Sequence, residues 1–176
     1  VSNFYDYKNF ETLIHGYFDL PSDLKHDHPL VLCGYPMNAR YYSSVVNLIE
    51  ELSLSDFIFI IPGLSSVDLK FLYTNAYLFI FPSLVENCPN SLLEAFSHSL
   101  PVLCADTPSS REFADEAAVY FSPLSPQEVS SSLQNLLLSK DCLSHYSNLS
   151  FQKSLHFNWL KFSRSVLQLC CRALSL

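Results

Sequence analysis

Short apolar runs recur along this 176-residue chain and alternate with amphipathic segments, and this alternation constrains the fold more than any other feature. The runs have the length of buried strands. They are residues 30–34, 57–61, 77–81, 101–104 and 117–121. Alternating strands and helices at this spacing predict an α/β fold, with a Rossmann-like parallel sheet and helices on both faces.

The amphipathic segments carry apolar residues at helical spacing. The first stripe begins at Phe10 and the second at Tyr41. Ser65 and Asp68 form a predicted capping box that opens a short helix. Further helices are expected at about 90–98, at about 129–137, and in two pieces from 139 onward with a break near 157–159.

The composition excludes several classes of protein. Hydrophobic residues make up 49% of the chain, which excludes a disordered one. The net charge of −7 argues against a nucleic-acid partner. No apolar run approaches the ~20 residues of a membrane span, and no signal peptide is present. The six cysteines form no CxxC pair, so we interpret them as free thiols, mostly core fillers, in a reducing cytoplasmic compartment.

The stretch from residue 81 to 95 is the most informative for function. A strand ends, a loop follows, and a helix starts near Asn90, a favoured N-cap residue. The free N–H groups of Ser91 to Leu93 would then form an anion site at the sheet edge where ligands bind. Glu86 and Glu94 would border the same ligand. From spacing alone, Glu86 could equally be an ordinary loop charge and Glu94 an ordinary solvated helix residue.

This stretch resembles the signature of glycosyltransferase family 4, in which two Glu residues are separated by seven positions, as Glu86 and Glu94 are. The resemblance covers nearly the whole chain. Residues 73–83, 92–102, 111–123 and 157–159 are similar, in order, to the segments that surround the signature.

The resemblance implies the two-domain GT-B fold, with residues 1–176 as its C-terminal, donor-binding domain. The helices of about 139–176 would pack partly toward a missing N-terminal domain. The chain opens at Val1 without an initiating Met, as if within a strand, which predicts a fragment that is inactive alone. The full enzyme would transfer a sugar with retention from a nucleotide-diphosphate sugar to a hydroxyl acceptor, in polysaccharide or glycoconjugate synthesis. No metal or other cofactor is expected, and the enzyme could associate peripherally with the inner face of the membrane.

The resemblance also implies the site. Glu86 would contact the transferred sugar as the catalytic residue, and Glu94 would bind the ribose hydroxyls. The amides after Asn90, those of Ser91 and Leu92, would hold a phosphate. Asn87 stands among residues that replace the family's usual glycines, which alters the sugar contacts.

The remaining donor contacts come from two other loops. The base would lie against Gly63 and Leu64, and Lys8 would pair with the diphosphate. Asn3 stands where the family usually has Arg, so it can offer the phosphates only a neutral hydrogen bond.

Alternatives remain at this stage. One is a non-catalytic donor-binding or scaffold subunit, and another is a sugar-nucleotide epimerase on the same fold. A dinucleotide-binding domain is disfavoured because the three glycines form no GxGxxG motif. His98, four residues after Glu94, is expected to pair with it on the helix face.

Overall fold

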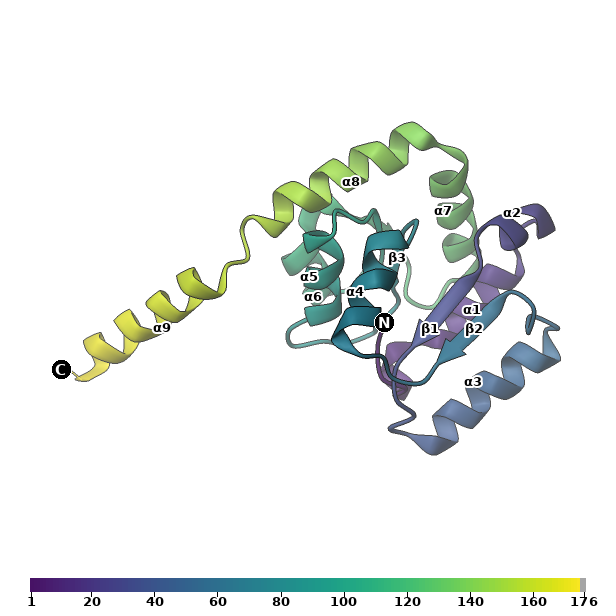
Figure 1. Ribbon diagram of the computed structural model, residues 1–176, viewed down its shortest axis with the longest axis horizontal. Coiled ribbons are helices and arrows are strands. Elements are labelled where there is room, and N and C mark those ends of the chain that lie inside the picture. Colours follow the sequence, from purple (N-terminus) through teal and green to yellow (C-terminus); the bar gives the residue numbers. More distant parts are fainter. Residues whose placement is uncertain (175–176) are drawn as a thin grey trace.

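The computed structural model describes residues 1–174, except for the side chains at positions 159 and 161. It contains short parallel strands flanked by helices, as Figure 1 shows. The strands are β1 (Leu30–Cys33), β2 (Ile58–Ile61), β3 (Phe79–Phe81), β4 (Val102–Ala105) and β5 (Val119–Phe121). Each of the five corresponds to a predicted apolar run, so the α/β class is confirmed.

The strands form two sheets. β1 pairs with β2, with Leu30 opposite Ile58, and β3, β4 and β5 pair in that order. All the pairings are parallel, as predicted; within the described residues the facing edges of β1 and β3 do not pair with each other. Residues 1–4 run beside the end of β1 without forming a strand.

Helices cover both sides of the strands (Figure 1). They are α1 (Phe10–Phe18), α2 (Ser22–Asp27), α3 (Ala39–Glu51), α4 (Ser66–Asn75), α5 (Asn90–Ser97), α6 (Pro108–Ala114), α7 (Pro126–Leu138), α8 (Lys140–Ser154) and α9 (Trp159–Leu174), with 3-10 turns η1 (Asp6–Lys8) and η2 (Asp115–Ala117).

The helices α2 and α6 were not predicted, because each is too short to show a helical period. Local capping defines α6: the hydroxyl of Thr107 accepts a hydrogen bond from the Ser110 N–H at 3.2 Å, and Pro108 occupies the first turn. Ser65 caps α4 as predicted: its hydroxyl accepts from the Asp68 N–H at 3.2 Å and donates to the Asp68 carboxylate at 2.6 Å.

The core forms on both sides of the strands. One cluster joins α1, α3 and α7 and includes the fully buried Phe4 and Val45. The other joins α5 to β3 and β4 and includes Phe96 and Val102. All six cysteines are free thiols, but only Cys33 and Cys104 are buried. The interpretation of the thiols as mostly core fillers is therefore wrong.

The C-terminal part divides between two environments. α8 packs against α5, and the buried hydroxyl of Ser150 donates a 2.6 Å hydrogen bond to the carbonyl of Leu100. Figure 1 shows α9 projecting from the rest of the chain, after the predicted break. Its apolar side chains, including Phe162 and Leu167, are exposed. Positions 175 and 176 lie outside the described residues.

Candidate functional site

A polar cavity of about 430 Å³ lies where the loops after β1, β2 and β3 meet residues 1–8. Parallel α/β sheets bind ligands at this edge. Eight of the ten predicted site residues line the cavity, and these are Asn3, Lys8, Gly63, Leu64, Glu86, Asn90, Ser91 and Glu94. Asn87 is exposed outside it, and the side chain of Leu92 is fully buried in the core.

Lys8 and Glu86 form an ion pair across the cavity. The Lys8 Nζ donates to Oε1 of Glu86, and the two side chains are only 12% and 15% exposed. The loops that carry them are joined by the backbone, because the Leu84 N–H donates to the Tyr7 carbonyl at 2.8 Å. Without a ligand, the predicted phosphate-binding cation is therefore neutralised by the predicted sugar-binding carboxylate.

Glu94 is oriented by a tyrosine that the sequence reasoning missed. The hydroxyl of Tyr73, on α4, donates to Oε2 of Glu94 at 2.9 Å and lies 3.3 Å from the Ser91 carbonyl. Tyr73 is buried, and burial together with the adjacent Glu94 carboxylate raises its pKa, so it remains a protonated donor. No local pattern indicates this contact, because 21 positions separate the two residues.

The prediction that His98 pairs with the Glu94 carboxylate is wrong. The His98 Nδ1 lies 2.9 Å from the Glu94 carbonyl oxygen, and its ring stacks on Tyr73 with centroids 5.3 Å apart. The histidine therefore closes the end of α5 and packs against Tyr73, which leaves the carboxylate to the tyrosine.

The N-terminus of α5 offers fewer free amides than predicted. The cap position is Pro89, and Asn90 is the first helical residue, without a side-chain cap. The Pro89 carbonyl already accepts from the N–H groups of Leu92 and Leu93, at 3.0 and 3.1 Å. Within residues 1–174, the Ser91 N–H has no recorded acceptor. The predicted anion site is thereby reduced to that amide and the positive end of the helix.

Gly63 brings an aromatic ring over the loop after β2. Its φ of +69° lies in the left-handed region, and a Cβ there would come within 2.3 Å of the Tyr35 ring. Tyr35 also lines the cavity and is 57% exposed, so one ring face can meet a planar ligand. The backbone N–H of Tyr35 donates to the Asn3 side chain at 3.0 Å. Asn3 thus orders this loop, a role that the sequence did not indicate.

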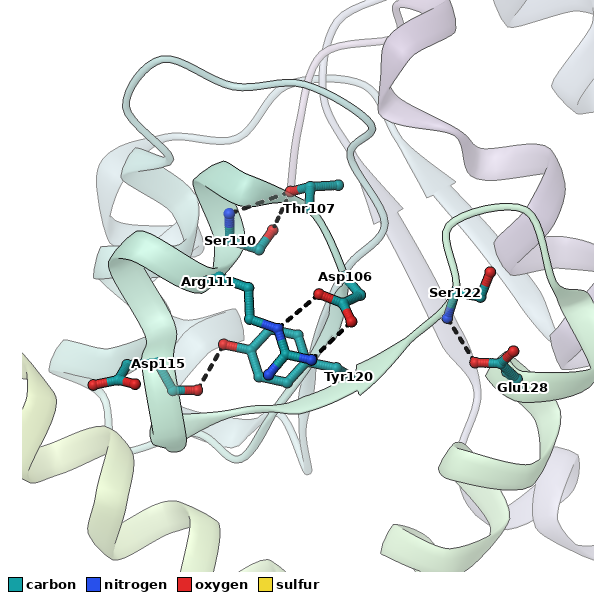
Figure 2. A network of polar contacts seen from close by, with 8 residues as sticks. All are labelled: Asp106, Thr107, Ser110, Arg111, Asp115, Tyr120, Ser122 and Glu128. Atoms are coloured by element: carbon teal, nitrogen blue, oxygen red, sulfur yellow. Dashed lines mark hydrogen bonds and ion pairs between the residues drawn. The ribbon is translucent and has the colours of Figure 1, made fainter.

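A second polar network follows β4 and β5, as Figure 2 shows. The Arg111 guanidinium donates to both carboxylate oxygens of Asp106, at 2.6 and 2.7 Å, and lies 3.6 Å from the ring centroid of Tyr120. The hydrogen bond from Arg111 lowers the pKa of Asp106. Arg111 therefore fastens α6 to β5 and is not a free cation for an anionic ligand.

Residues 1–174, the part of the chain that the structure describes, bear on two other kinds of site. No three His, Cys, Asp or Glu side chains in that part of the chain are grouped as metal ligands would be. None of its helices is both long and apolar enough to cross a membrane.

The fold and the site together define a class of protein. A parallel α/β domain with a cavity at the carboxyl ends of its strands has the Rossmann-like architecture. The family model described as "Glycosyl transferases group 1" matches residues 1–151. The chain belongs to this family.

Two similar bacterial proteins are mannosyltransferases by name. The chain is 26% identical over 141 residues to the O-antigen chain mannosyltransferase RfbU of Salmonella typhimurium, a match that covers 77% of this chain and 39% of RfbU. It is 29% identical over 153 residues to the serotype-specific mannosyltransferase WbdA of Escherichia coli, covering 86% of this chain and 19% of WbdA. The chain therefore spans well under half the length of these relatives.

Solved structures share the fold. Anabaena HepE, in complex with UDP and glucose, superposes with a TM-score of 0.86 at 16% identity, over 97% of this chain and 47% of HepE. The C-terminal domain of the group 1 glycosyl transferase LpcC from Francisella tularensis superposes with a TM-score of 0.77 at 16% identity, over 89% of this chain and 82% of that one.

Proposed function

We propose that this chain is the donor-binding half of a retaining glycosyltransferase, which transfers a sugar from a nucleoside-diphosphate sugar to a hydroxyl acceptor in polysaccharide or glycoconjugate synthesis. One observation carries the proposal. A single cavity at the carboxyl edge of the strands is lined by a cation, Lys8, by two carboxylates, Glu86 and Glu94, and by the first turn of α5 with its open Ser91 amide. HepE, which shares the fold, was solved with UDP and glucose, and the relatives RfbU and WbdA are named as an O-antigen chain mannosyltransferase and a serotype-specific mannosyltransferase.

The ion pair explains how the cavity could accept a diphosphate. A phosphate oxygen competes with Glu86 for Lys8, and the Ser91 N–H at the positive end of α5 adds a second donor. Once released from Lys8, the Glu86 carboxylate can accept hydrogen bonds from the hydroxyls of the transferred sugar. Binding the diphosphate and presenting the catalytic carboxylate are then coupled.

The nucleoside would occupy the other end of the cavity. Glu94, held by Tyr73, accepts from the ribose hydroxyls, and the base lies between Leu64 and the exposed ring of Tyr35. No step in this scheme uses a metal ion or another cofactor.

We further propose that the whole enzyme has a second, N-terminal domain. The relatives are more than twice as long as the part that matches, and the exposed apolar side chains of α9 offer a surface for that domain. In this scheme the second domain supplies the acceptor site, so the isolated chain binds the donor and transfers nothing. The enzyme works in the cytoplasm, with peripheral attachment to the membrane that carries its acceptor.

The test is a double-mutant cycle on Glu94. Wild-type chain and Glu94→Gln are titrated by calorimetry with UDP, GDP and the 2′,3′-dideoxy forms of both. The wild type should bind the ribonucleotide more tightly than the dideoxy form, and Glu94→Gln should lose most of that difference, since an amide oxygen is the weaker acceptor. Glu51→Gln, at an exposed position in α3, is the matched control. A coupling energy near zero for both bases would remove Glu94 from the donor site.

A second candidate function is a donor-binding subunit without turnover. It is favoured by Asn3, whose side chain is engaged with the Tyr35 N–H and carries no charge for the phosphates. Nucleotide binding without transfer by the full-length protein, across a panel of acceptors, would select this alternative.

A further inference from the structure

Asn9 directly follows Lys8 and is one of the few buried polar residues beside the donor cavity. Its side chain is buried, and its φ of +55° lies in the left-handed region, which asparagine tolerates better than most residues. This conformation ends the turn η1 and begins α1. The position therefore combines a backbone conformation that favours glycine with a polar side chain that glycine lacks.

The amide of Asn9 makes three hydrogen bonds. Its Nδ2 donates to the carbonyl of Pro123 at 2.7 Å and to that of Pro82 at 3.3 Å. Its Oδ1 accepts from the Thr12 hydroxyl at 2.7 Å. Because carbonyl oxygens only accept hydrogen bonds, the amide nitrogen must be the atom that faces both prolines. Both N–H groups and the oxygen of this buried amide are thus engaged.

These bonds join the turn that carries Lys8 to two loops at the carboxyl edge of the strands. Pro82 directly follows β3 and opens the loop that leads to Glu86, and Pro123 lies in the loop after β5. Asn9 therefore contacts the loop of the catalytic carboxylate from the position next to the phosphate-binding cation.

Three contacts follow one another along these two segments. Residue 9 contacts residue 82 through its side chain, residue 7 accepts from the N–H of residue 84, and residue 8 pairs with residue 86. The first two contacts involve groups outside the lining of the donor cavity, so a ligand in the cavity leaves them in place. The third is the ion pair that a diphosphate would open.

We propose that Asn9 is a positioning residue, which holds Lys8 against Glu86 and thereby places both charged groups for the diphosphate and the sugar of the donor. The inference rests on the proposed function of the donor cavity. Asn9 does not line that cavity, so it acts through Lys8. A lysine side chain is a flexible four-carbon stem, and its amine reaches one place reproducibly only where its backbone is held.

The test measures the coupling between Lys8 and Glu86 with and without the Asn9 side chain. Lys8→Met, Glu86→Gln and the double variant form a double-mutant cycle, and urea unfolding gives the coupling energy. The cycle is repeated in Asn9→Gly, which retains the left-handed conformation and removes the three hydrogen bonds. We expect the coupling to fall to less than half. A purely structural role would lower the stability of all four chains alike and leave the coupling unchanged.

Two further backgrounds complete the cycle. Ser53→Gly is the matched control, because Ser53 also has a φ of +55° but follows α3, away from the lining of the donor cavity. There the coupling should not change. Thr12→Val removes only the hydrogen bond that orients the Asn9 oxygen, and it should reduce the coupling by a smaller fraction.

Undiminished coupling in Asn9→Gly would overturn the proposal, because the backbone bond between Leu84 and Tyr7 would then be enough to hold the pair. If Asn9→Gly does not fold, undiminished coupling in Thr12→Val has the same meaning. An equal fall in Ser53→Gly would also contradict it, since the effect would then belong to glycine and not to the lost hydrogen bonds.

Calorimetric titration with UDP, GDP, uridine and guanosine adds a ligand readout. Asn9→Gly should weaken diphosphate binding roughly two- to tenfold and leave nucleoside binding unchanged. In the Lys8→Met background the same change should have no further effect, and equal losses in both backgrounds would contradict action through Lys8. A chain that binds none of the four ligands would count against the donor site alone, because the coupling measured in urea needs no ligand.

Discussion

Replacing Tyr73 by Phe removes a single oxygen from the buried support of the donor site. The ring keeps its packing against Phe79 and His98, at centroid distances of 5.9 and 5.3 Å, so no cavity opens. What is lost is the 2.9 Å hydrogen bond to the Glu94 carboxylate and the longer, 3.3 Å contact with the Ser91 carbonyl. The change therefore isolates the effect of orienting that carboxylate.

The magnitude follows from the surroundings of the bond. A hydrogen bond to a charged group contributes about 1.5–3 kcal/mol when both partners are dry. Glu94 is exposed, so water can replace the phenol, and we expect a loss of only about 1 kcal/mol in unfolding free energy, or about 2–4 °C in Tm. Reordering a freed side chain on binding costs about 0.5–1.5 kcal/mol, which weakens nucleotide affinity roughly two- to tenfold.

The assay is calorimetric titration of Tyr73→Phe with UDP or GDP and with the dideoxy form. Affinity for the ribonucleotide should fall while that for the dideoxy form changes little. Tyr120→Phe is the matched control, because its hydroxyl donates at 2.7 Å to the Asp115 carbonyl in the network of Figure 2, away from the donor cavity. Equal losses for both ligands, or stability loss with unchanged affinity, would refute the orienting role of Tyr73.

Three further outcomes are expected. Lys8→Met should weaken nucleoside-diphosphate binding roughly ten- to a hundredfold and leave nucleoside affinity unchanged, and calorimetric titration should show a smaller effect at high salt. The same substitution should lower the free energy of unfolding, because Glu86 loses its partner. In urea unfolding, the double variant Lys8→Met/Glu86→Gln should recover this loss. Burial lowers the pKa of the Val1 amine to about 6, so between about pH 6 and 8 the unfolded chain binds this proton and the folded chain does not, and stability should rise with pH across that window. The difference between the free and the N-acetylated chain in urea unfolding isolates this contribution, and equal pH profiles for the two would show that the amine is solvated. Ser150→Ala should lower the free energy of unfolding by about 1–3 kcal/mol, because the Leu100 carbonyl loses its buried donor. An unchanged urea midpoint would mean that this hydrogen bond does not stabilise the packing of α8.

Much of the fold could be predicted because its signals are local. Strands buried on both faces appear as short apolar runs, and helices with one buried face appear as stripes, so all five strands and the main helices lie where the patterns place them. The spacing of Glu86 and Glu94 is likewise a local feature, and both do line one cavity. The helices α2 and α6 escaped prediction because they span too few turns to show a period.

By itself, the sequence determined the class of fold and most of the residues that line the cavity at the carboxyl edge of the strands; that this cavity binds the donor stays a prediction. Only the tertiary structure decided how those residues are paired. The Lys8–Glu86 pair joins residues 78 positions apart, and Tyr73 reaches Glu94 from another helix. Such contacts depend on how loops and helices pack once the strands are aligned, and no local sequence pattern predicts that packing. The pairing of the strands has the same origin, since a run of apolar residues predicts a strand but not the neighbour with which its backbone pairs.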